Sequence, residues 1–381
     1  MTHETDVARL RSLTCIKWNH YPDDVLPAWV ADMDLPPAPV AVDAVRALLD
    51  RGDLGYNFAA ASRIPDVFAR RQNERFGWSP DVESTRLFCD VLQAVELALW
   101  AHTKPGDGVV LLTPVYHPFY AAIETAKCRL VDVPLDDPSW ELDAERLEAA
   151  IDATTRVVLL CNPHNPTGHA LRVEELRALA DIAERHDLLV ISDEIWSDLV
   201  FAPARHIPFA SVSPEAAART VTITAASKAF NLAGMCCAVG HLGHEGVAAA
   251  VGALPRHLLG AVSSLGAEAT LAAWTLGDEW LETTNTQLRA NRDHLAARLA
   301  RELPEVGLDV PDATYLAWLD FRALGLGDDP AAVLLEKARV GLSPGLQFGG
   351  AGAGFARLNF ATTGELLDEI VDRIVGAVGQ R

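Results

Sequence analysis

Basic residues are scarce in this sequence, and lysine is the scarcest of them. Lys and Arg together number 32 against 52 Asp and Glu, which gives a formal net charge of −20. A field of this sign excludes binding to nucleic acid or to an anionic membrane through the protein's overall charge. Only five lysines occur, at positions 17, 104, 127, 228 and 337. A lysine with a chemical role is therefore easy to recognise.

Long apolar runs are missing as well. No stretch reaches the roughly 18 residues that a membrane-spanning helix needs, and the polar start 1–6 lacks the features of a signal peptide. None of the six cysteines forms a CxxC pair, which is typical of buried thiols in a reducing compartment. We therefore predict a cytoplasmic protein with no membrane segment and no metal site, the adjacent Cys236 and Cys237 included.

The composition is that of a folded protein, because 50% of the residues are apolar and 22% are charged, and this balance excludes disorder. Between residues 87 and 240, short apolar runs alternate with amphipathic helical segments such as 172–186. This alternation predicts a mostly parallel sheet covered by helices on both faces, a three-layer α/β fold. The predicted strands are 109–113, 129–133, 156–161, 188–192 and 220–224.

The two ends of the chain have a different pattern. Residues 1–48 are rich in proline, with one helix expected over 39–50, whereas residues 280–381 mix helices and strands. The expected elements there are helix 282–303, strand 315–320, helix 330–339, strand 355–360 and a final helix. We predict a smaller α+β domain built from both chain ends: residues 1–48 join it, residues 49–279 form the large domain, and residues 280–381 complete the small one.

Asn165 comes soon after the predicted strand 156–161. The segment Cys161-Asn-Pro-His-Asn-Pro-Thr-Gly168 holds two Asn-Pro steps, which impose an extended and rigid backbone. An ordinary turn before the next helix is the alternative, but such a turn needs neither asparagine. We interpret Asn165 as a fixed amide donor above the sheet.

Asp193 follows the predicted strand 188–192 directly, in Ser192-Asp-Glu-Ile-Trp-Ser-Asp198. A carboxylate at the carboxyl end of an apolar strand is costly to bury unless it meets a cation or hydrogen-bond donors. Asp193 therefore either caps a helix or faces a cation such as a protonated ring nitrogen.

Lys228 follows the predicted strand 220–224, in Thr224-Ala-Ala-Ser-Lys-Ala-Phe-Asn-Leu-Ala-Gly234. Its neighbours are small or apolar, and no acidic residue lies close in the sequence. A desolvated lysine has a lowered pKa and becomes a usable nucleophile or base. The alternative is a lysine whose ammonium group reaches the surface.

Together, a strand-end asparagine, aspartate and lysine in this order suit pyridoxal 5'-phosphate. Lysine bonds to the cofactor aldehyde, aspartate keeps the pyridine nitrogen protonated, and asparagine donates to the phenolic oxygen. The sequence resembles the fold-type I pyridoxal-phosphate enzymes, the aspartate aminotransferase superfamily. Lys17-Trp-Asn and Asp24-Val-Leu-Pro-Ala-Trp-Val-Ala-Asp-Met-Asp34 resemble the MalY/PatB branch, which comprises cystathionine β-lyases and cysteine-S-conjugate C–S lyases.

This resemblance implies roles for further residues. Tyr116 matches the aromatic residue that stacks on the cofactor ring. Arg357, in Phe355-Ala-Arg-Leu-Asn-Phe360, matches the arginine that binds the substrate α-carboxylate, and Ala31 falls where a backbone group meets that carboxylate. Tyr56 matches a tyrosine that reaches the phosphate of the neighbouring subunit, which implies a homodimer with shared active sites.

The expected phosphate site is the start of the helix after Cys89-Asp90, where the N–H groups of Val91 and Leu92 suit an anion. Asp90 stands where the family usually has glycine, so that a capping carboxylate lies near the phosphate. The other phosphate ligands stay open, with Ser227 a candidate.

Two further positions depart from the family pattern. Cys236 lies eight residues after Lys228, where many aminotransferases carry an arginine, and the loss of that cation fits the lyase branch better. Trp196 lies three residues after Asp193, where related enzymes tend to have Tyr or His; its indole N–H can donate to the phenolic oxygen but cannot accept a proton.

The resemblance predicts a pyridoxal-phosphate-dependent C–S β-lyase that converts cystathionine or another cysteine S-conjugate into a thiol, pyruvate and ammonia. Two alternatives stay open. One is a class I/II aminotransferase, which shares every step up to the Cα carbanion. The other is a specialised biosynthetic enzyme that acts on a cysteine conjugate.

Overall fold

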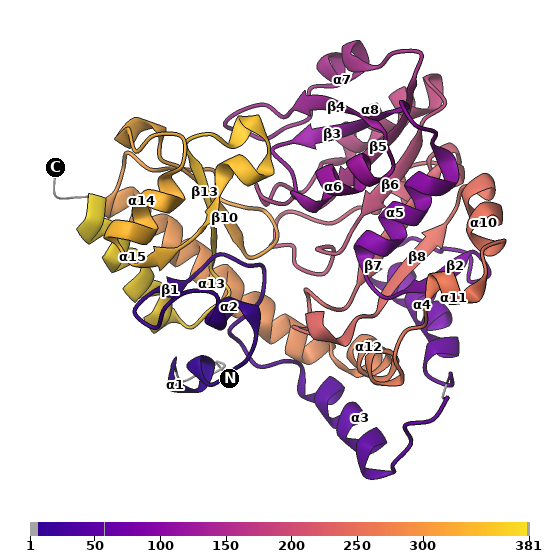
Figure 1. The fold of residues 1–381 in the computed structure, drawn as a ribbon, viewed down its shortest axis with the longest axis horizontal. Helices are drawn as coiled ribbons and strands as arrows, with labels where there is room; N and C mark the ends of the chain where they lie inside the picture. Colours follow the sequence, from indigo (N-terminus) through magenta and orange to yellow (C-terminus); the bar gives the residue numbers. More distant parts are fainter. Residues whose placement is uncertain (1–6, 57, 379–381) are drawn as a thin grey trace.

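A seven-stranded sheet forms the larger part of the fold. The computed structural model describes residues 7–56 and 58–378 (Figure 1). The inner strands of this sheet are buried on both faces, as in other sheets covered by helices, whereas its two edge strands are partly exposed. Across the sheet the order is β2 (Thr85–Phe88), β8 (Ala238–Leu242), β7 (Thr220–Ala225), β6 (Leu189–Asp193), β5 (Thr155–Cys161), β3 (Gly108–Thr113) and β4 (Arg129–Pro134).

The strands from β7 to β4 pair in parallel, and β8 pairs antiparallel with both of its neighbours. Cys161 at the end of β5 lies beside Asp193 at the end of β6, which in turn lies beside Ile223 of β7. The segments that follow these three strands therefore start from one edge of the sheet.

Helices cover both faces of this sheet. Alternate residues of β3 point to opposite sides, so that Val109 and Leu111 join one core and Val110 and Leu112 join the other. The first core is closed by α5 (Val91–His102), α6 (Pro118–Thr125) and α10 (Glu245–Gly252). The second is closed by α7 (Ala144–Ala150), α8 (Val173–Arg185) and α9 (Pro214–Ala218). The predicted three-layer α/β fold is confirmed.

A second, four-stranded antiparallel sheet lies beside the first (Figure 1). Its order is β12 (Ser343–Pro344), β13 (Phe355–Asn359), β10 (Leu316–Asp320) and β9 (Gly307–Leu308). The apolar side chains of α13 (Asp278–Glu302), α14 (Pro330–Lys337) and α15 (Gly364–Val378) pack in the same core as this sheet. α13 begins four residues earlier than the predicted 282, and Asp278 in its first turn pairs with Arg71 at 2.7 Å.

The N-terminal segment packs against the C-terminal part of the chain. After α1 (Val7–Arg11) and α2 (Ile16–Asn19), β1 (Leu26–Pro27) pairs in parallel with β11 (Val340–Gly341). An ion pair of 2.7 Å between Asp24 and Arg339 joins the same two segments.

The chain then crosses back towards the large sheet. α3 (Pro39–Asp50) packs against α12 (Ser264–Leu276), as does α4 (Ile64–Phe76). The short α11 (Arg256–Leu259) precedes α12. No helix in the described part of the chain has the length and apolarity needed to cross a membrane.

Candidate active site

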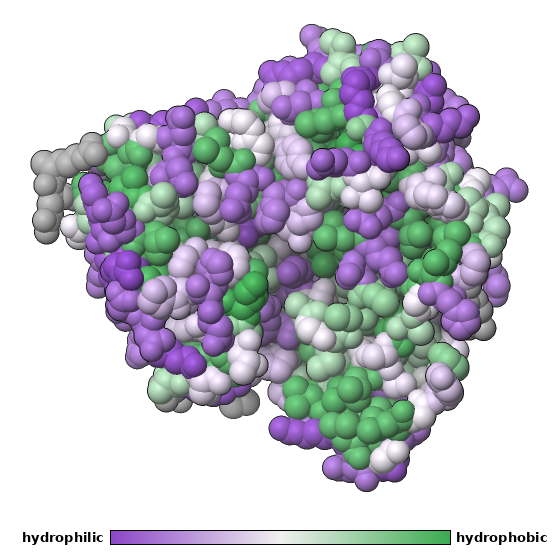
Figure 2. Space-filling view, viewed as in Figure 1, coloured by the Kyte–Doolittle hydropathy of each residue, from purple (hydrophilic) through white to green (hydrophobic). Residues whose placement is uncertain are grey.

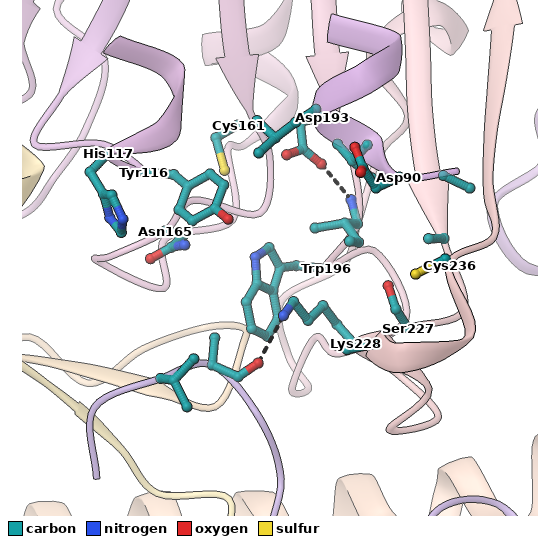
Figure 3. A pocket seen from close by; sticks show the side chains of 18 of the residues that line it. Asp90, Tyr116, His117, Cys161, Asn165, Asp193, Trp196, Ser227, Lys228 and Cys236 are labelled. Atoms are coloured by element: carbon teal, nitrogen blue, oxygen red, sulfur yellow. Dashed lines mark hydrogen bonds between the residues drawn. The ribbon is translucent and has the colours of Figure 1, made fainter. Parts of the chain in front are cut away.

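A cavity of about 550 Å³ opens at the carboxyl ends of β5, β6 and β7. Its opposite wall comes from the N-terminal segment and from the small sheet, so both ends of the chain contribute. Figure 3 shows side chains from these elements pointing into one space. The predicted site residues that line it are Ala31, Val91, Leu92, Tyr116, Asn165, Asp193, Trp196, Ser227, Lys228 and Arg357.

Asp193 is a buried carboxylate at the end of β6. Among the described residues it accepts one hydrogen bond, 3.0 Å from the backbone N–H of Ile195. Burial is the main reason that its pKa rises to about 7 from the ordinary 3.8, and the neighbouring Glu194 adds to the rise. A buried carboxylate with so few hydrogen-bond donors is strongly stabilised by a cation placed in the cavity.

Lys228 reaches the cavity from the segment after β7. Its Nζ donates a hydrogen bond of 2.8 Å to the backbone carbonyl of Ala31 (Figure 3) and lies 5.9 Å from the centroid of the Trp196 ring. Burial lowers the pKa of Lys228, and the charge of Asp32 offsets part of this effect. The amine is therefore shifted towards the neutral form that a base or nucleophile needs.

Arg357 lies on β13, almost fully buried on the other side of the cavity. Its guanidinium donates to Asn165 Oδ1 at 2.8 Å, to the carbonyl of Trp29 at 2.9 Å and to Ser343 Oγ at 3.1 Å. Burial lowers its pKa to about 10, and within the described residues no carboxylate forms an ion pair with it. Its Nε has no hydrogen-bond partner there either, so an incoming carboxylate would meet an uncompensated cation.

Asn165 is held in place by its hydrogen bond with Arg357. Because its oxygen accepts from Arg357, its amide nitrogen is left as a donor at the wall of the cavity. Figure 3 shows Asn165 below Tyr116 and to the left of Trp196. Burial raises the pKa of Tyr116 to about 12, so its hydroxyl stays protonated at neutral pH.

Residues 28–35, here called the strap, cross the front of the small sheet and bring Ala31 to Lys228. Side chains hold the strap through its backbone carbonyls. Asn359 donates to the carbonyls of residues 30 and 32 at 2.7 Å each, and Asn231 donates to those of residues 33 and 35 at 3.2 and 2.7 Å. The position of Ala31 is therefore set by Asn359 at the end of β13 and by Asn231 in the segment after β7.

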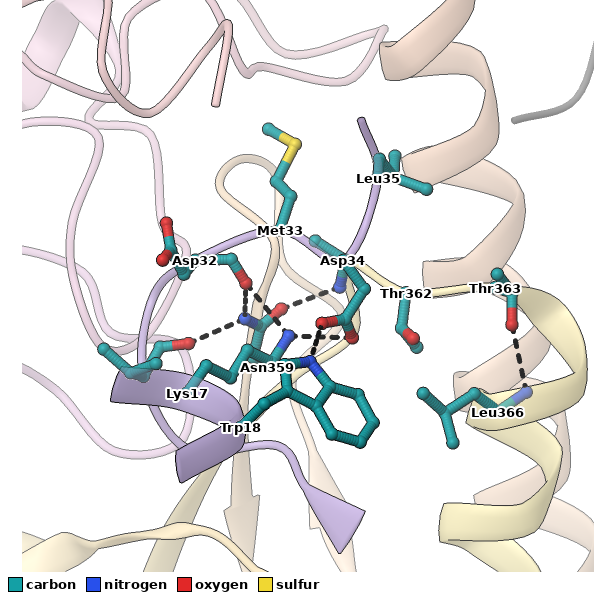
Figure 4. A network of polar contacts seen from close by, with 12 residues as sticks. Lys17, Trp18, Asp32, Met33, Asp34, Leu35, Asn359, Thr362, Thr363 and Leu366 are labelled. Carbon is teal, nitrogen blue, oxygen red and sulfur yellow. Dashed lines mark hydrogen bonds and ion pairs between the residues drawn. The ribbon is translucent and has the colours of Figure 1, made fainter. Parts of the chain in front are cut away.

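A buried ion pair anchors the end of the strap (Figure 4). Lys17 Nζ lies 2.9 Å from a carboxylate oxygen of Asp34, and both side chains are 2% exposed. Lys17 also donates to the carbonyl of Asp32 at 3.0 Å, and the indole of Trp18 donates to Asp34 at 2.7 Å. The N-terminal Lys-Trp and Asp-Met-Asp motifs therefore form one contact network.

The start of α5 forms the remaining end of the cavity. Asp90 is the N-cap, and its carboxylate accepts from the N–H of Gln93 at 2.7 Å. The amides of Val91 and Leu92 lie in the first turn, where no intrahelical carbonyl is available to them. Ser227 and the exposed Cys236 line the cavity near Asp90 (Figure 3).

Tyr56 is the one predicted site residue that this chain does not bring to its own cavity. The side chain is fully exposed, at 101% of its reference area. Trp196, in contrast, is 2% exposed and packs edge-on against Tyr315, with 4.8 Å between the ring centroids.

The geometry can be compared with known proteins. Residues 78–374 match the family model for aminotransferase class I and II. The chain belongs to this family. It is 37% identical to cystathionine beta-lyase PatB of Bacillus subtilis (strain 168) over 360 residues, which cover 93% of each protein.

Two solved structures are similar over nearly their whole length. Cystalysin from Treponema denticola, which contains a pyridoxal 5'-phosphate cofactor, has a TM-score of 0.94 and 28% identity, and the match covers all of this chain and 99% of that one. The pyridoxal-phosphate-bound C–S lyase from Staphylococcus hominis has a TM-score of 0.92 and 28% identity over 97% of each chain. The predicted family, cofactor and C–S lyase branch are confirmed.

The cavity of this family member fits pyridoxal 5'-phosphate. Its donor set places an amine, a buried carboxylate short of partners and an amide donor around one space large enough for the ring. The poorest fit is the end near Asp90, where the described lining residues include no lysine or arginine besides Lys228 and Arg357. An anion there would depend on backbone N–H groups and hydroxyls.

Sequence reasoning missed several residues that shape this site. Trp29 and Ser343 contact Arg357, and Tyr315 donates a hydrogen bond of 3.0 Å to the Ala31 carbonyl. Trp29 belongs to the N-terminal motif 24–34, so the motif already indicated that it lies near the site. Ser343 and Tyr315 lie in no motif, and only the packing of the small sheet reveals them.

Proposed function

We propose that this protein cleaves the Cβ–S bond of cystathionine or another cysteine S-conjugate and releases a thiol, pyruvate and ammonia. The observation that carries the proposal is one cavity shared by a base, an electron-sink partner and a carboxylate receptor, namely Lys228, Asp193 and Arg357. Membership of the family and the names of its relatives support it.

In this proposal six side chains would hold the cofactor. Lys228 would bond to its aldehyde, Asp193 would pair with the ring nitrogen, and Asn165 would donate to the phenolic oxygen. Tyr116 and Trp196, which also line the cavity, would contact the ring. The N–H groups of residues 91 and 92 and the hydroxyl of Ser227 receive the phosphate. When bound, the cofactor supplies an electron sink for the charge that develops at the substrate Cα.

The chain's own residues then orient the substrate and move its proton. Arg357 binds the α-carboxylate through a buried guanidinium that lacks a carboxylate partner of its own, while the strap at Ala31 borders the same place. Lys228, once its amine is free, takes the Cα proton, because burial lowers its pKa and so favours the neutral amine. Asp193 would stabilise a positive charge on the ring nitrogen, and the thiolate leaves from Cβ of the substrate.

An aminotransferase would use the same residues up to loss of the Cα proton, and a specialised biosynthetic enzyme could divert a cysteine conjugate from that point. Product analysis with L-cystathionine and with a small S-alkyl cysteine separates these activities. We expect equal amounts of thiol, pyruvate and ammonia without any 2-oxo acid. Turnover that stops after one equivalent and resumes only with a 2-oxo acid would establish transamination instead.

We further propose a homodimer in which Tyr56 completes the partner's cavity. Figure 2 shows apolar side chains gathered over the region of α3, and the exposed large side chains near it include Leu49, Leu54 and Phe58. A second copy of the chain would cover this surface and the fully exposed Tyr56.

A mixed dimer tests the shared site. Pairing a Tyr56→Phe subunit with a Lys228→Ala subunit places both defects in one site and leaves the other site intact. About half of the wild-type activity should therefore survive. If each subunit used its own tyrosine, the hybrid would retain no more than half of the activity of the Tyr56→Phe dimer.

The division into residues 1–48, 49–279 and 280–381 and the cytoplasmic location remain part of the proposal. Pairing of β1 with β11 supports the assignment of the N-terminal segment to the small domain. All six cysteines are free, and burial raises the pKa of Cys161 and of Cys237, the latter to about 11. Thiols of this kind suit a reducing compartment.

A further inference from the structure

The carbonyl of Ala31 accepts two side-chain hydrogen bonds at once. Lys228 Nζ donates from the large-sheet side at 2.8 Å, and the hydroxyl of Tyr315 donates from the small-sheet side at 3.0 Å. Tyr315 lies directly before β10, whereas Lys228 follows β7. One backbone oxygen of the strap is therefore the meeting point of the two halves of the site.

Tyr315 is placed for this contact with little freedom. It is 1% exposed, and a buried hydroxyl needs a partner. Its ring packs edge-on against Trp196, whose face lies 5.9 Å from Lys228 Nζ. The amine is thus bordered by a carbonyl, a hydroxyl and an indole ring.

The acceptor itself is fixed. The carbonyls on either side of Ala31, those of residues 30 and 32, are both bonded to the amide of Asn359 at 2.7 Å. The Ala31 oxygen cannot follow a moving lysine without breaking these bonds. A neutral Lys228 amine that donates one N–H to the Ala31 oxygen keeps its nitrogen lone pair free to accept a proton.

We propose that Tyr315 is a positioning residue that, through the Ala31 carbonyl, holds the amine of Lys228 whenever that amine is not bonded to the cofactor. This inference rests on the proposed function, in which the substrate frees the amine before the amine takes the Cα proton. The hydroxyl acts by occupying one lone pair of the carbonyl, so that the lysine has a single direction of approach.

The groups around Lys228 determine which change in its pKa a test should detect. Asp32 and Asp193 favour the charged amine, while Arg357 and burial oppose it. Removing the Tyr315 hydroxyl leaves these four influences in place and frees one lone pair of the Ala31 oxygen. The carbonyl then stabilises an ammonium group better, so the pKa of Lys228 should rise.

The experiment is the substitution Tyr315→Phe, which keeps the ring against Trp196. Trace acetylation of the cofactor-free protein with acetic anhydride across a pH series, read for each lysine by mass spectrometry, follows Lys228 directly. We expect the Lys228 profile to move up by about half a pH unit. The exposed lysines 104, 127 and 337 serve as internal standards that should not move.

Tyr21→Phe is the matched control, because Tyr21 also packs against the strap, but at the ring of Trp29 rather than at the Ala31 carbonyl. In the cofactor-loaded enzyme, Tyr315→Phe should lower kcat about tenfold and leave KM within about twofold. A Lys228 profile that coincides with the wild type would overturn the inference. If instead the profile moves but no cysteine conjugate yields pyruvate in any variant, the proposed function fails and the positioning role stands.

Discussion

Replacing Asp193 by Asn should stabilise the cofactor-free protein and cripple the loaded enzyme. Asn keeps the shape of the side chain and an oxygen for the Ile195 N–H. The pKa of Asp193 is about 7 in the folded chain against the ordinary 3.8, a difference of about three units. This corresponds to roughly 4 kcal/mol for holding the ionised carboxylate in its buried place.

The pH dependence follows from the direction of this shift. Below pH 3.8 the carboxyl is protonated in the folded and unfolded chains alike, and it costs nothing. Between pH 3.8 and about 7 the unfolded chain gives up its proton first, so the stability of wild-type protein falls as the pH rises. Above pH 7 the full penalty is present, and the substitution removes it.

Denaturant unfolding of the cofactor-free proteins at pH 5 and pH 8 measures this effect. At pH 8 we expect Asp193→Asn to raise the free energy of unfolding by up to about 4 kcal/mol, with a gain about 2.7 kcal/mol smaller at pH 5. In the loaded enzyme the sign reverses, because the ring nitrogen loses its counter-charge, and kcat/KM should fall at least about a thousandfold.

Asp198→Asn is the matched control. Asp198 is also buried, but it is paired with Arg71 at 3.1 Å and with Arg75 at 2.8 Å. The same chemical change there should destabilise both forms of the protein at pH 8. If Asp193→Asn also destabilised the cofactor-free protein at pH 8, Asp193 would be a satisfied structural carboxylate and the reasoning would be wrong.

Three further predictions follow from the site. Borohydride reduction of the loaded protein should attach the cofactor to Lys228, and peptide mapping that found it on any of the other four lysines would refute the assignment. Arg357→Lys should raise KM for cysteine conjugates about a hundredfold with a smaller change in kcat, since a bidentate, charge-assisted contact is lost; an unchanged KM would mean that another group binds the carboxylate. Lys17→Met should lower the free energy of unfolding by about 3–5 kcal/mol, because it leaves Asp34 buried without its cation. The double change Lys17→Met with Asp34→Asn should recover part of that loss in denaturant unfolding, and no recovery would show that the two residues do not act as a pair.

The sequence was sufficient to predict the residues that follow parallel strands. Asn165, Asp193 and Lys228 come after three buried strands, and parallel strands end at one edge of a sheet, so their convergence follows from topology. The same logic does not reach Tyr315, which precedes a strand of the other sheet and meets Lys228 only through the strap.

Other parts of the fold lacked a local signal. β8 was not predicted, because Ala238-Val-Gly-His-Leu has neither a continuous apolar run nor strict alternation. Tyr56 is assigned to the active site by resemblance alone, because its fully exposed side chain does not line the cavity of its own chain. The start of α13 at Asp278 was also missed. The partner of Asp278, Arg71, lies in α4, and the hydrophobic periodicity of a single helix does not reveal such a distant contact.

Pairing of β1 with β11 has a consequence for synthesis of the chain. A ribosome makes residues 26 and 27 long before their partners, residues 340 and 341. The strands of the large sheet, residues 85–242, are complete long before that, and such units form first during translation. The nascent chain therefore carries its N-terminal segment without a docking place for most of its synthesis. Ala31 therefore reaches Lys228, and Trp29 reaches Arg357, only after the C-terminal part of the chain has been made. A chain released before residue 340 has the large sheet but an incomplete active site.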